Sequence, residues 1–417
     1  MNTKNLYGCD ALSYPQGHAE EPLIQEFGHE MARPVGEIGL ADWMLKRGPD
    51  AVLLTPGPLN TDPRTREAMF RDWGSRDLQF LELTATIRRS LVDIINGHDL
   101  FTAVPLQGSG TFVVEATLAT LIPRVGGKAL VLVNGAYGRR MAQMLDYLGR
   151  TYCIYETSEV TPPVPEEVDR LLAEDPAISH VCLVHCETTA GILNPLAEIA
   201  TVTARRGRRL LVDAMSSFAA IPICAGKIQF DAVMASSNKC LEGPPGLGFA
   251  LIRKSALVGA KGNSHSLSLD LFDQWQSFER TGQWRFTPPT HIVAGLHRAI
   301  ELYQAEGGQA ARLRRYRNNC RLLIEGMRDL GFESFLPEEL QAPVIVTFRP
   351  LDDDRFDFEI FYRYLADRGF VIYPGKLTIA DSFRIGCIGD LRAEDMRCAL
   401  EAIRQALSEL TYSCKKK

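Results

Sequence analysis

The sequence predicts an α/β fold: a large domain built on a mainly parallel sheet, followed by a smaller α/β domain at the C-terminal end. From Ala51 onward, short apolar runs alternate with segments of helical periodicity, which is typical of successive β–α–β units. The apolar runs contain almost no polar residues, as expected for strands that helices cover on both faces. With 417 residues and 46% hydrophobic composition, the chain can bury a core of that size.

Several apolar runs are short enough to be buried strands, and longer segments between or after them have the period of helices. The expected strands lie at residues 129–133, 181–184, 210–212, 232–235 and 248–252, and the expected helices at 112–122, 195–206 and 292–304. Residues 1–49 show no clear period, so we treat them as an N-terminal extension of unknown role. The large domain is therefore expected to span residues 50–305.

The chain from residue 306 onward has a different pattern, which begins with one long charged amphipathic helix. Helices are expected at residues 312–330, 357–368 and 393–410, and strands at 344–348, 370–373 and 383–388. Asp390 is expected to cap the last helix, because a short acidic side chain accepts hydrogen bonds from first-turn N–H groups. Residues 306–417 are therefore predicted to form a compact domain of ordinary size.

The composition argues against nucleic-acid and membrane partners. The net charge is −5, from 46 basic and 51 acidic residues that are mixed along the chain, so no basic surface is expected. Ten cysteines show no C-x-x-C spacing, which is typical of reduced thiols and predicts neither a disulfide framework nor a metal site. No apolar core of a signal peptide and no apolar segment of membrane-spanning length is present. We expect a cytoplasmic protein whose partners are small molecules or copies of itself.

Lys239 is the leading candidate for a reactive group. It follows the apolar run at 232–235 and precedes the Gly/Pro-rich stretch Glu242-Gly-Pro-Pro-Gly-Leu-Gly248. Such a position can hold an amine in a partly desolvated pocket, where its pKa falls and it becomes a nucleophile able to form an imine. A lysine taken alone is more often an ordinary loop residue, so the surrounding motifs decide between the two interpretations.

Asp213 ends the apolar run at 210–212, at the edge where ligands of open α/β sheets bind. The separation from Lys239 leaves room for one crossover and one strand, so both side chains can reach the same edge. Pyridoxal phosphate (PLP) needs such a pair, because a carboxylate keeps its ring nitrogen protonated and the ring then accepts electrons. Taken alone, Asp213 is more often a helix N-cap or a loop residue than a functional group.

A glycine-containing turn precedes the expected helix at 112–122. In Gly108-Ser-Gly-Thr111 the backbone can approach a phosphate closely, and the helix N-terminus supplies N–H groups and a favourable dipole. A plain helix cap explains this short motif equally well. The turn has neither the Walker pattern nor G-x-G-x-x-G, which disfavours a nicotinamide dehydrogenase.

Eight motifs together resemble the class V aminotransferases of PLP fold type I. In chain order they are Leu54-Thr-Pro-Gly-Pro58, Gly108-Ser-Gly-Thr111, Asn134-Gly-Ala-Tyr-Gly138, His185-Cys-Glu-Thr-Thr-Ala-Gly191, Val212-Asp213, Ser237-Asn-Lys239, Phe286-Thr-Pro-Pro-Thr290 and Phe383-Arg-Ile-Gly386. The resemblance covers residues 51–411 and leaves out the N-terminal extension. It implies the PLP-dependent transferase fold, with a seven-stranded sheet in the large domain, and PLP as the cofactor.

The resemblance implies that Lys239 carries the cofactor covalently and that Asp213 pairs with the pyridinium nitrogen. Tyr137 corresponds to the aromatic residue that stacks on the cofactor ring, and Thr188 to the residue near its phenolic oxygen. Asn238 occupies the position just before the lysine. Without the family, Tyr137 is as well explained by a place in the core.

The remaining matches concern the anionic groups. The resemblance implies that the cofactor phosphate lies against Ser109, Gly110 and Thr111. It also implies that Thr287 and Thr290 reach the phosphate of a neighbouring subunit, which would make the protein a homodimer with shared active sites. Arg384 matches the arginine that binds the substrate's anionic group, for which a planar guanidinium is well suited.

The motifs are most similar to those of enzymes that move an amino group from 2-aminoethylphosphonate to pyruvate, giving phosphonoacetaldehyde and alanine. Alanine–glyoxylate, serine–pyruvate and phosphonoalanine transamination stay open as alternatives. A PLP-dependent lyase such as cysteine desulfurase is less favoured, because Cys320 and Cys387 fall in an expected helix and strand rather than on a loop. A non-catalytic PLP-fold binding protein is disfavoured because Lys239, Asp213 and Arg384 are all present.

Overall fold

The computed structural model describes residues 40, 42–43, 50–353 and 356–413. The chain divides into two compact units, Met1–Pro49 and Asp50–Lys417. The predicted extension at 1–49 falls almost entirely outside the described residues. Within the second unit, the division at residues 305 and 306 stays a prediction.

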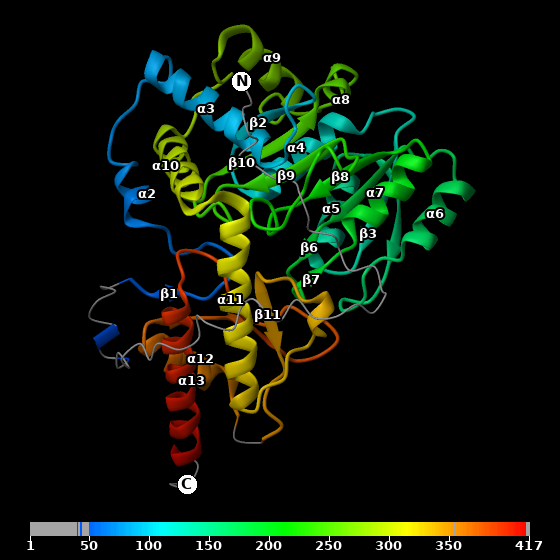
Figure 1. Cartoon of the computed structure of the whole chain (residues 1–417). Helices are drawn as coiled ribbons and strands as arrows, with labels where there is room; N and C mark the ends of the chain where they lie inside the picture. Colours follow the sequence, from blue (N-terminus) through cyan, green and yellow to red (C-terminus); the bar gives the residue numbers. More distant parts are fainter. Residues whose placement is uncertain (1–39, 41, 44–49, 354–355, 414–417) are drawn as a thin grey trace, which may run out of the picture. The chain divides into compact units, whose positions relative to one another are not determined.

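A seven-stranded sheet forms the centre of the second unit (Figure 1). Its strands, in spatial order, are β2 (Phe101–Gln107), β10 (Leu247–Arg253), β9 (Ala232–Ser236), β8 (Arg209–Asp213), β5 (His180–Val184), β3 (Lys128–Val133) and β4 (Thr151–Glu156). Only β10 runs antiparallel to its neighbours, and the pairs from β9 to β4 are parallel. The prediction of a large, mainly parallel sheet is confirmed.

Helices cover both faces of the sheet because the strands are apolar on both sides. In β3, Leu130 and Leu132 join one buried cluster while Ala129 and Val131 join the other, as the two-residue period of a strand requires. The first cluster includes residues of α3 (Leu78–Ile94), α6 (Pro165–Glu174), α7 (Leu196–Arg205) and α10 (Thr290–Glu306). The second includes residues of α4 (Gly110–Leu121), α5 (Ala136–Tyr147), α8 (Lys254–Val258) and α9 (Leu271–Thr281).

The C-terminal elements build a second, smaller sheet. It is antiparallel, in the order β11 (Ile345–Phe348), β14 (Phe383–Gly386) and β13 (Tyr373–Pro374), and it packs with α11 (Gly308–Asp329), α12 (Phe358–Asp367) and α13 (Ala393–Ser413). A core of phenylalanine rings, including Phe332, Phe348, Phe361 and Phe383, fills the space between them. Figure 1 shows α11 as the long yellow helix that runs from the level of the large sheet down beside α13.

Short elements connect these parts. They are α2 (Pro63–Glu67), the hairpin of β6 (Cys186–Glu187) with β7 (Ile192–Leu193), the 3₁₀ turn Glu338–Leu340, and β1 (Val52–Leu53), which pairs parallel with β12 (Phe370–Val371).

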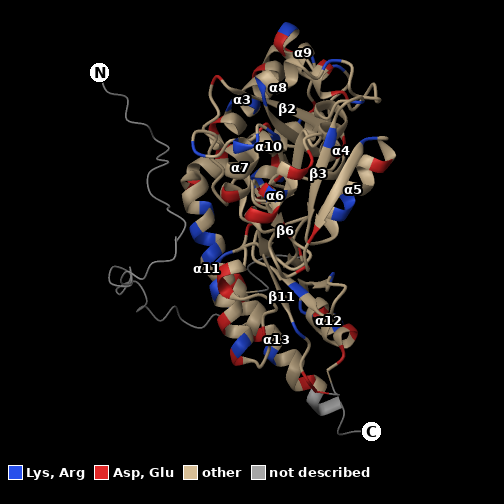
Figure 2. Ribbon diagram, turned by 90° about the vertical axis from the view of Figure 1, so that its right-hand side faces the viewer, with Lys and Arg blue, Asp and Glu red and all other residues tan. Residues whose placement is uncertain are grey.

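Basic and acidic positions are interspersed along the ribbon in Figure 2, as the mixed sequence predicts. No helix in the described ranges is long and apolar enough to cross a bilayer. The cysteines of those ranges are free thiols.

Two details differ from the sequence prediction. The run at 370–373 forms two strands instead of one, because Phe370–Val371 pairs with β1 whereas Tyr373–Pro374 pairs with β14. Asp390 is not the N-cap of the last helix. That helix begins at Ala393, and the N–H of the preceding Arg392 is bonded to the Asp395 carboxylate (2.6 Å).

Candidate active site

The parallel strands end at one edge of the large sheet, and a cavity of about 210 Å³ opens there. Asp213 is the last residue of β8, and Lys239 follows the end of β9. The N-termini of α4 and α5 reach the same cavity. Its lining contains these predicted site residues: Ser109, Gly110, Thr111, Tyr137, Thr188, Asp213, Asn238 and Lys239. The tertiary structure therefore brings together side chains that are 130 positions apart in the sequence (239 − 109).

Lys239 is held against the backbone of the Thr-Pro-Gly-Pro segment. Its ammonium donates a hydrogen bond to the Pro56 carbonyl (Nζ–O 2.6 Å). Burial lowers the pKa of the amine, because the charged form loses its hydration. At Gly57 the backbone φ is +122°, and a Cβ would lie 2.5 Å from Lys239 Nζ. A glycine is therefore required beside the lysine, both for its conformation and for space.

Asp213 is buried, with 5% of its surface exposed. Its Oδ1 accepts a hydrogen bond from the Met215 N–H (2.9 Å). Desolvation raises the pKa of the carboxyl to about 6, and the nearby Glu187 charge adds to that rise. Among the described residues, no lysine or arginine lies within 4 Å of it. The carboxylate at the cavity wall thus forms no ion pair in the described residues, although the charges of Lys239 and Arg140 oppose the rise in its pKa.

An anion-binding end is formed by the N-terminus of α4. The amides of Gly110 and Thr111 open the helix and find no acceptor in the described part of the chain, which is the usual state of first-turn N–H groups. At Gly110 a Cβ would lie 2.5 Å from the Met215 sulfur, so a larger residue there would displace the Met215 side chain. Arg140 reaches over from α5 and donates to the Thr111 hydroxyl (Nη1–Oγ1 3.5 Å). A cation and helix N–H groups therefore face the same end of the cavity.

Glu187 fixes the first turn of α5, which carries Tyr137. Its Oε2 accepts from the N–H groups of Tyr137 (3.0 Å) and Gly138 (3.3 Å), and its Oε1 accepts from the Thr189 N–H and hydroxyl. Burial raises the pKa of Glu187, and these hydrogen bonds oppose the rise. Gly135 is needed for the approach, because a Cβ there would lie 2.5 Å from Glu187 Cδ. A buried carboxylate thus stabilises the positive end of the helix.

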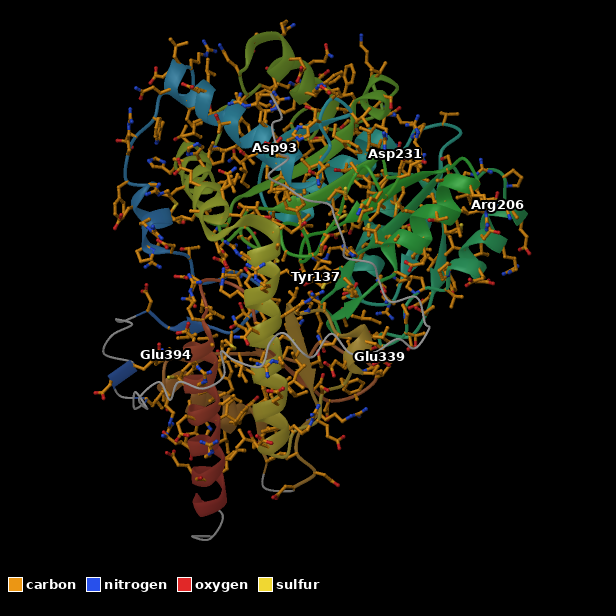
Figure 3. All side chains as sticks on the ribbon, viewed as in Figure 1. Asp93, Tyr137, Arg206, Asp231, Glu339 and Glu394 are labelled. Carbon is orange, nitrogen blue, oxygen red and sulfur yellow. The ribbon has the colours of Figure 1, made fainter. Side chains whose placement is uncertain are left out.

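The Tyr137 ring lies among cations. Figure 3 labels it between the large sheet and the C-terminal strands. Lys376 Nζ is 4.0 Å and Arg140 Cζ is 5.0 Å from the ring centroid. Burial by itself would raise the pKa of the phenol, but the charge of Lys376 and a hydrogen bond with Thr188 hold it below its usual value.

Arg384 lies on β14, the central strand of the small sheet, and is 6% exposed. Its Nε donates to the Pro374 carbonyl (3.1 Å) and its Nη1 to the Thr188 carbonyl (2.9 Å). Burial lowers the pKa of the guanidinium. No carboxylate lies within 4 Å of it in the described ranges. A buried guanidinium without a carboxylate is suited to binding an anionic ligand.

Comparison with known proteins identifies the family. Residues 69–378 match the model of the aminotransferase class-V family. The chain belongs to the class V aminotransferases. It is 56% identical over 359 residues, 86% of its length, to the 2-aminoethylphosphonate–pyruvate transaminases of Pseudomonas putida KT2440 and Pseudomonas aeruginosa UCBPP-PA14, and the match covers 97% and 96% of those proteins.

Solved structures show the same fold for this aminotransferase. The alanine–glyoxylate aminotransferase of Nostoc sp. superposes with a TM-score of 0.79 at 25% identity, covering 86% of this chain and 96% of that one. The ureidoglycine–glyoxylate aminotransferase of Bacillus subtilis superposes with a TM-score of 0.79 at 22% identity, covering 87% and 94%. The predicted PLP-dependent transferase fold is confirmed.

Pyridoxal phosphate is the cofactor of this class V aminotransferase, and the chemistry of the cavity fits it. A buried amine with a lowered pKa suits the carbonyl carbon of the cofactor. Asp213, a buried carboxylate that forms no ion pair in the described residues, suits a protonated ring nitrogen. The α4 N-terminus with Arg140 suits a phosphate.

Thr287 and Thr290 do not reach the cavity of the aminotransferase chain. Thr287 is exposed and lines a separate hollow with Ser75 and Arg76. Thr290 is half-buried and begins α10. Neither side chain lies beside Lys239, so within one chain these two residues are not part of the site.

Sequence reasoning missed Arg140, Glu187 and Lys376 as functional candidates. Arg140 lies two positions after the Asn134–Gly138 motif, and Glu187 lies inside the His185–Gly191 motif, so both could have been found from the sequence. The useful signal was a charged residue within or beside an otherwise apolar or glycine-rich motif. Lys376 offered no such signal, since its partner Tyr137 is 239 positions away (376 − 137).

Proposed function

We propose that this class V aminotransferase moves an amino group from 2-aminoethylphosphonate to pyruvate, giving phosphonoacetaldehyde and alanine. The observation that carries the proposal is the 56% identity, over 86% of the chain, to two Pseudomonas enzymes named for that reaction. The buried Arg384, which lacks a carboxylate partner among the described residues, supports an anionic substrate. The same guanidinium serves the phosphonate and the carboxylate in turn, as an alternating reaction requires.

Two side chains act on protons. When bound, pyridoxal phosphate supplies an electron sink for the carbon that loses its proton. Lys239 would hold the cofactor through its amine and, when that amine is free, would take up and return the proton at the substrate carbon. Its lowered pKa supports this role, because a base must be neutral before it accepts a proton. Asp213, as a carboxylate, keeps a proton on the ring nitrogen.

The other predicted residues bind and orient. Ser109, Gly110 and Thr111 hold the phosphate at the positive end of α4. Tyr137 stacks on the cofactor ring, supported by its place on the cavity wall. Asn238 and Thr188 line the same cavity, and the Thr188 carbonyl also accepts a hydrogen bond from Arg384, which links the cofactor end to the substrate end.

The enzyme acts as a homodimer with shared sites, in which Thr287 and Thr290 contact the partner's cofactor phosphate. The exposure of Thr287 and its distance from its own chain's cavity support this arrangement. The cytoplasm is the proposed location, and residues 50–305 and 306–417 are the proposed large and small domains.

The shared site is tested by subunit mixing. Inactive Lys239→Ala and inactive Thr287→Ala/Thr290→Ala subunits are dissociated and reassembled together, which should restore one intact site per mixed dimer. An active monomer contradicts the shared site.

The reaction is tested with a panel of amino donors and two acceptors. Purified enzyme is incubated with 2-aminoethylphosphonate, serine or phosphonoalanine, each with pyruvate or glyoxylate, and with alanine and glyoxylate, and the products are identified by mass. Phosphonoacetaldehyde and alanine are expected as the fastest products. Preferred use of serine or phosphonoalanine, or of glyoxylate as acceptor, assigns one of the alternative transaminations. Borohydride reduction followed by peptide mapping is expected to find the cofactor on Lys239.

A further inference from the structure

Lys376 belongs to the small sheet and lies on Tyr137, a residue of the cavity wall. It lies in the loop between β13 and β14, whose closure is fixed by the hydrogen bond from the Gly375 N–H to the Ser382 carbonyl (2.8 Å). Gly375 packs so closely on Ser382 that a Cβ would meet its backbone. From this loop the Lys376 ammonium reaches the Tyr137 ring, 4.0 Å from its centroid. Lys376 and Arg384 therefore contact two residues of the cavity wall, Tyr137 and Thr188, from the two sides of one hairpin, although neither of them lines the cavity itself.

The loop is anchored to the large sheet on the far side of Lys376. Thr378 donates two hydrogen bonds to the buried Glu159, from its N–H (2.7 Å) and its hydroxyl (3.1 Å). Arg139 neutralises the same carboxylate (Nη1–Oε1 3.2 Å). Leu377, between Lys376 and Thr378, packs against Ala190, Ile192 and Leu336. The backbone at Lys376 is thus held, while its four-carbon side chain keeps its own freedom to turn.

In the described part of the chain, neither Lys376 nor Arg384 forms an ion pair, although the buried Glu187 charge acts on Arg384 from farther away. Neither Lys376 nor Arg384 has an acidic oxygen within 4 Å in the part of the chain that the structure describes. Arg384 uses its Nε and Nη1 on two backbone carbonyls, so its Nη2 has no protein acceptor there. Two cations that converge without a counterion favour a ligand with more than one negative charge.

The carboxylate and the phosphonate that the enzyme would bind differ in how many donors and positive charges they require. A carboxylate is planar, carries one charge and is satisfied by a single guanidinium fork. A phosphonate is tetrahedral and, like a phosphate monoester, has three acceptor oxygens and a charge of about −2 near neutral pH. One guanidinium leaves part of that charge and an oxygen without a partner. A lysine, as a compact point charge with three rotatable donors, is suited to the remaining oxygen.

We propose that Lys376 is the second cation for the phosphonate of the amino donor, and that it sets the preference for a phosphonate over a carboxylate, whereas Arg384 serves both. The inference rests on the proposed function. In the absence of substrate the ammonium lies on the Tyr137 ring, a favourable cation–π contact. When the phosphonate binds, the side chain exchanges this contact for a phosphonate oxygen, while Thr378 keeps the loop in place.

The test compares two donors in the loaded enzyme. Each half-reaction, with 2-aminoethylphosphonate or with L-alanine, is titrated by the absorbance change of the cofactor, for the wild type, Lys376→Met and Lys376→Arg. Lys261→Met, at an exposed position in a loop, is the matched control. Binding of two unreactive anions, ethylphosphonate and propionate, is measured by competition and by thermal shift.

Lys376→Met is expected to weaken 2-aminoethylphosphonate and ethylphosphonate by about tenfold or more, since a charge-assisted contact is lost. L-alanine and propionate should change by less than about twofold, and Lys376→Arg should recover most of the loss. Equal losses for both anion classes, or no loss for ethylphosphonate, overturn the assignment. If wild-type enzyme does not convert 2-aminoethylphosphonate, the proposed function fails, and the ratio of ethylphosphonate to propionate binding still tests Lys376.

Discussion

Replacing Asp213 with asparagine should stabilise the cofactor-free protein while it inactivates the enzyme. The carboxyl is buried and forms no ion pair in the described part of the chain, and desolvation outweighs the charges of Lys239 and Arg140, so its charged form is disfavoured. The amide has nearly the same shape and carries no charge. Its oxygen can still accept the Met215 N–H. The substitution therefore removes the free-energy cost of burying a charged carboxylate, and it opens no cavity.

The magnitude follows from the pKa. Desolvation raises the Asp213 pKa from 3.8 to about 6, which corresponds to about 3 kcal/mol at 1.36 kcal/mol per unit. Because the folded pKa lies above the unfolded one, protonated Asp213 favours folding below about pH 4, and that contribution is lost as the pH rises through 6. The ionisation penalty is about half developed at pH 5 and reaches about 3 kcal/mol at pH 8.

Denaturant unfolding of cofactor-free protein, compared between wild type and Asp213→Asn at pH 5 and pH 8, measures this penalty. The stability gain of the variant should be larger at pH 8 than at pH 5, and comparing the two pH values removes any cost of the amide that does not depend on pH. With cofactor bound, the neutral amide no longer keeps the ring nitrogen protonated, so single-turnover rates should fall by orders of magnitude. A gain that is equal at both pH values refutes the desolvation argument, and near-wild-type turnover refutes the role in catalysis.

Other predictions follow from contacts around the cavity. Gly57→Ala should reduce borohydride-fixed cofactor on Lys239 by about tenfold, because the new Cβ meets Nζ and the backbone is strained. Glu187→Gln should lower the stability by about 2 kcal/mol in denaturant unfolding, since its amide N–H₂ faces donors such as the Tyr137 N–H. Arg384→Lys keeps the charge but loses the planar fork, so KM should rise about tenfold or more for both 2-aminoethylphosphonate and pyruvate, with kcat less affected.

The first two of these variants have matched controls. Gly207→Ala has a similar strained backbone, with φ +65°, but its Cβ meets nothing within 4 Å, so it should leave cofactor loading unchanged. Glu167→Gln, in an exposed ion pair with Arg170, should cost far less stability than Glu187→Gln. Full loading of Gly57→Ala, an unchanged unfolding midpoint for Glu187→Gln, or unaltered KM values for Arg384→Lys would contradict the respective contacts.

The sequence by itself determined the layered fold and one edge of the site. The apolar runs at 129–133, 181–184 and 210–212 became β3, β5 and β8 within a residue or two, because strands buried on both faces leave a continuous apolar signal. Asp213 ends β8 and Lys239 follows β9, the neighbouring parallel strand. The alternation of apolar runs and helical segments was therefore enough to predict that both lie at the same edge of the sheet. The run at 370–373 could not be divided in this way, since its two halves differ only in which strands they meet.

Only the tertiary structure decided which polar groups from distant parts of the sequence contact one another. Thr188 and Arg384 are 196 positions apart, and Glu159 and Thr378 are 219 apart, yet each pair is hydrogen-bonded. A periodic pattern tells which face of an element is buried but not which distant element packs on it. The sequence around Lys376 does not indicate its contact with Tyr137, which forms because Thr378 anchors the hairpin that carries the lysine.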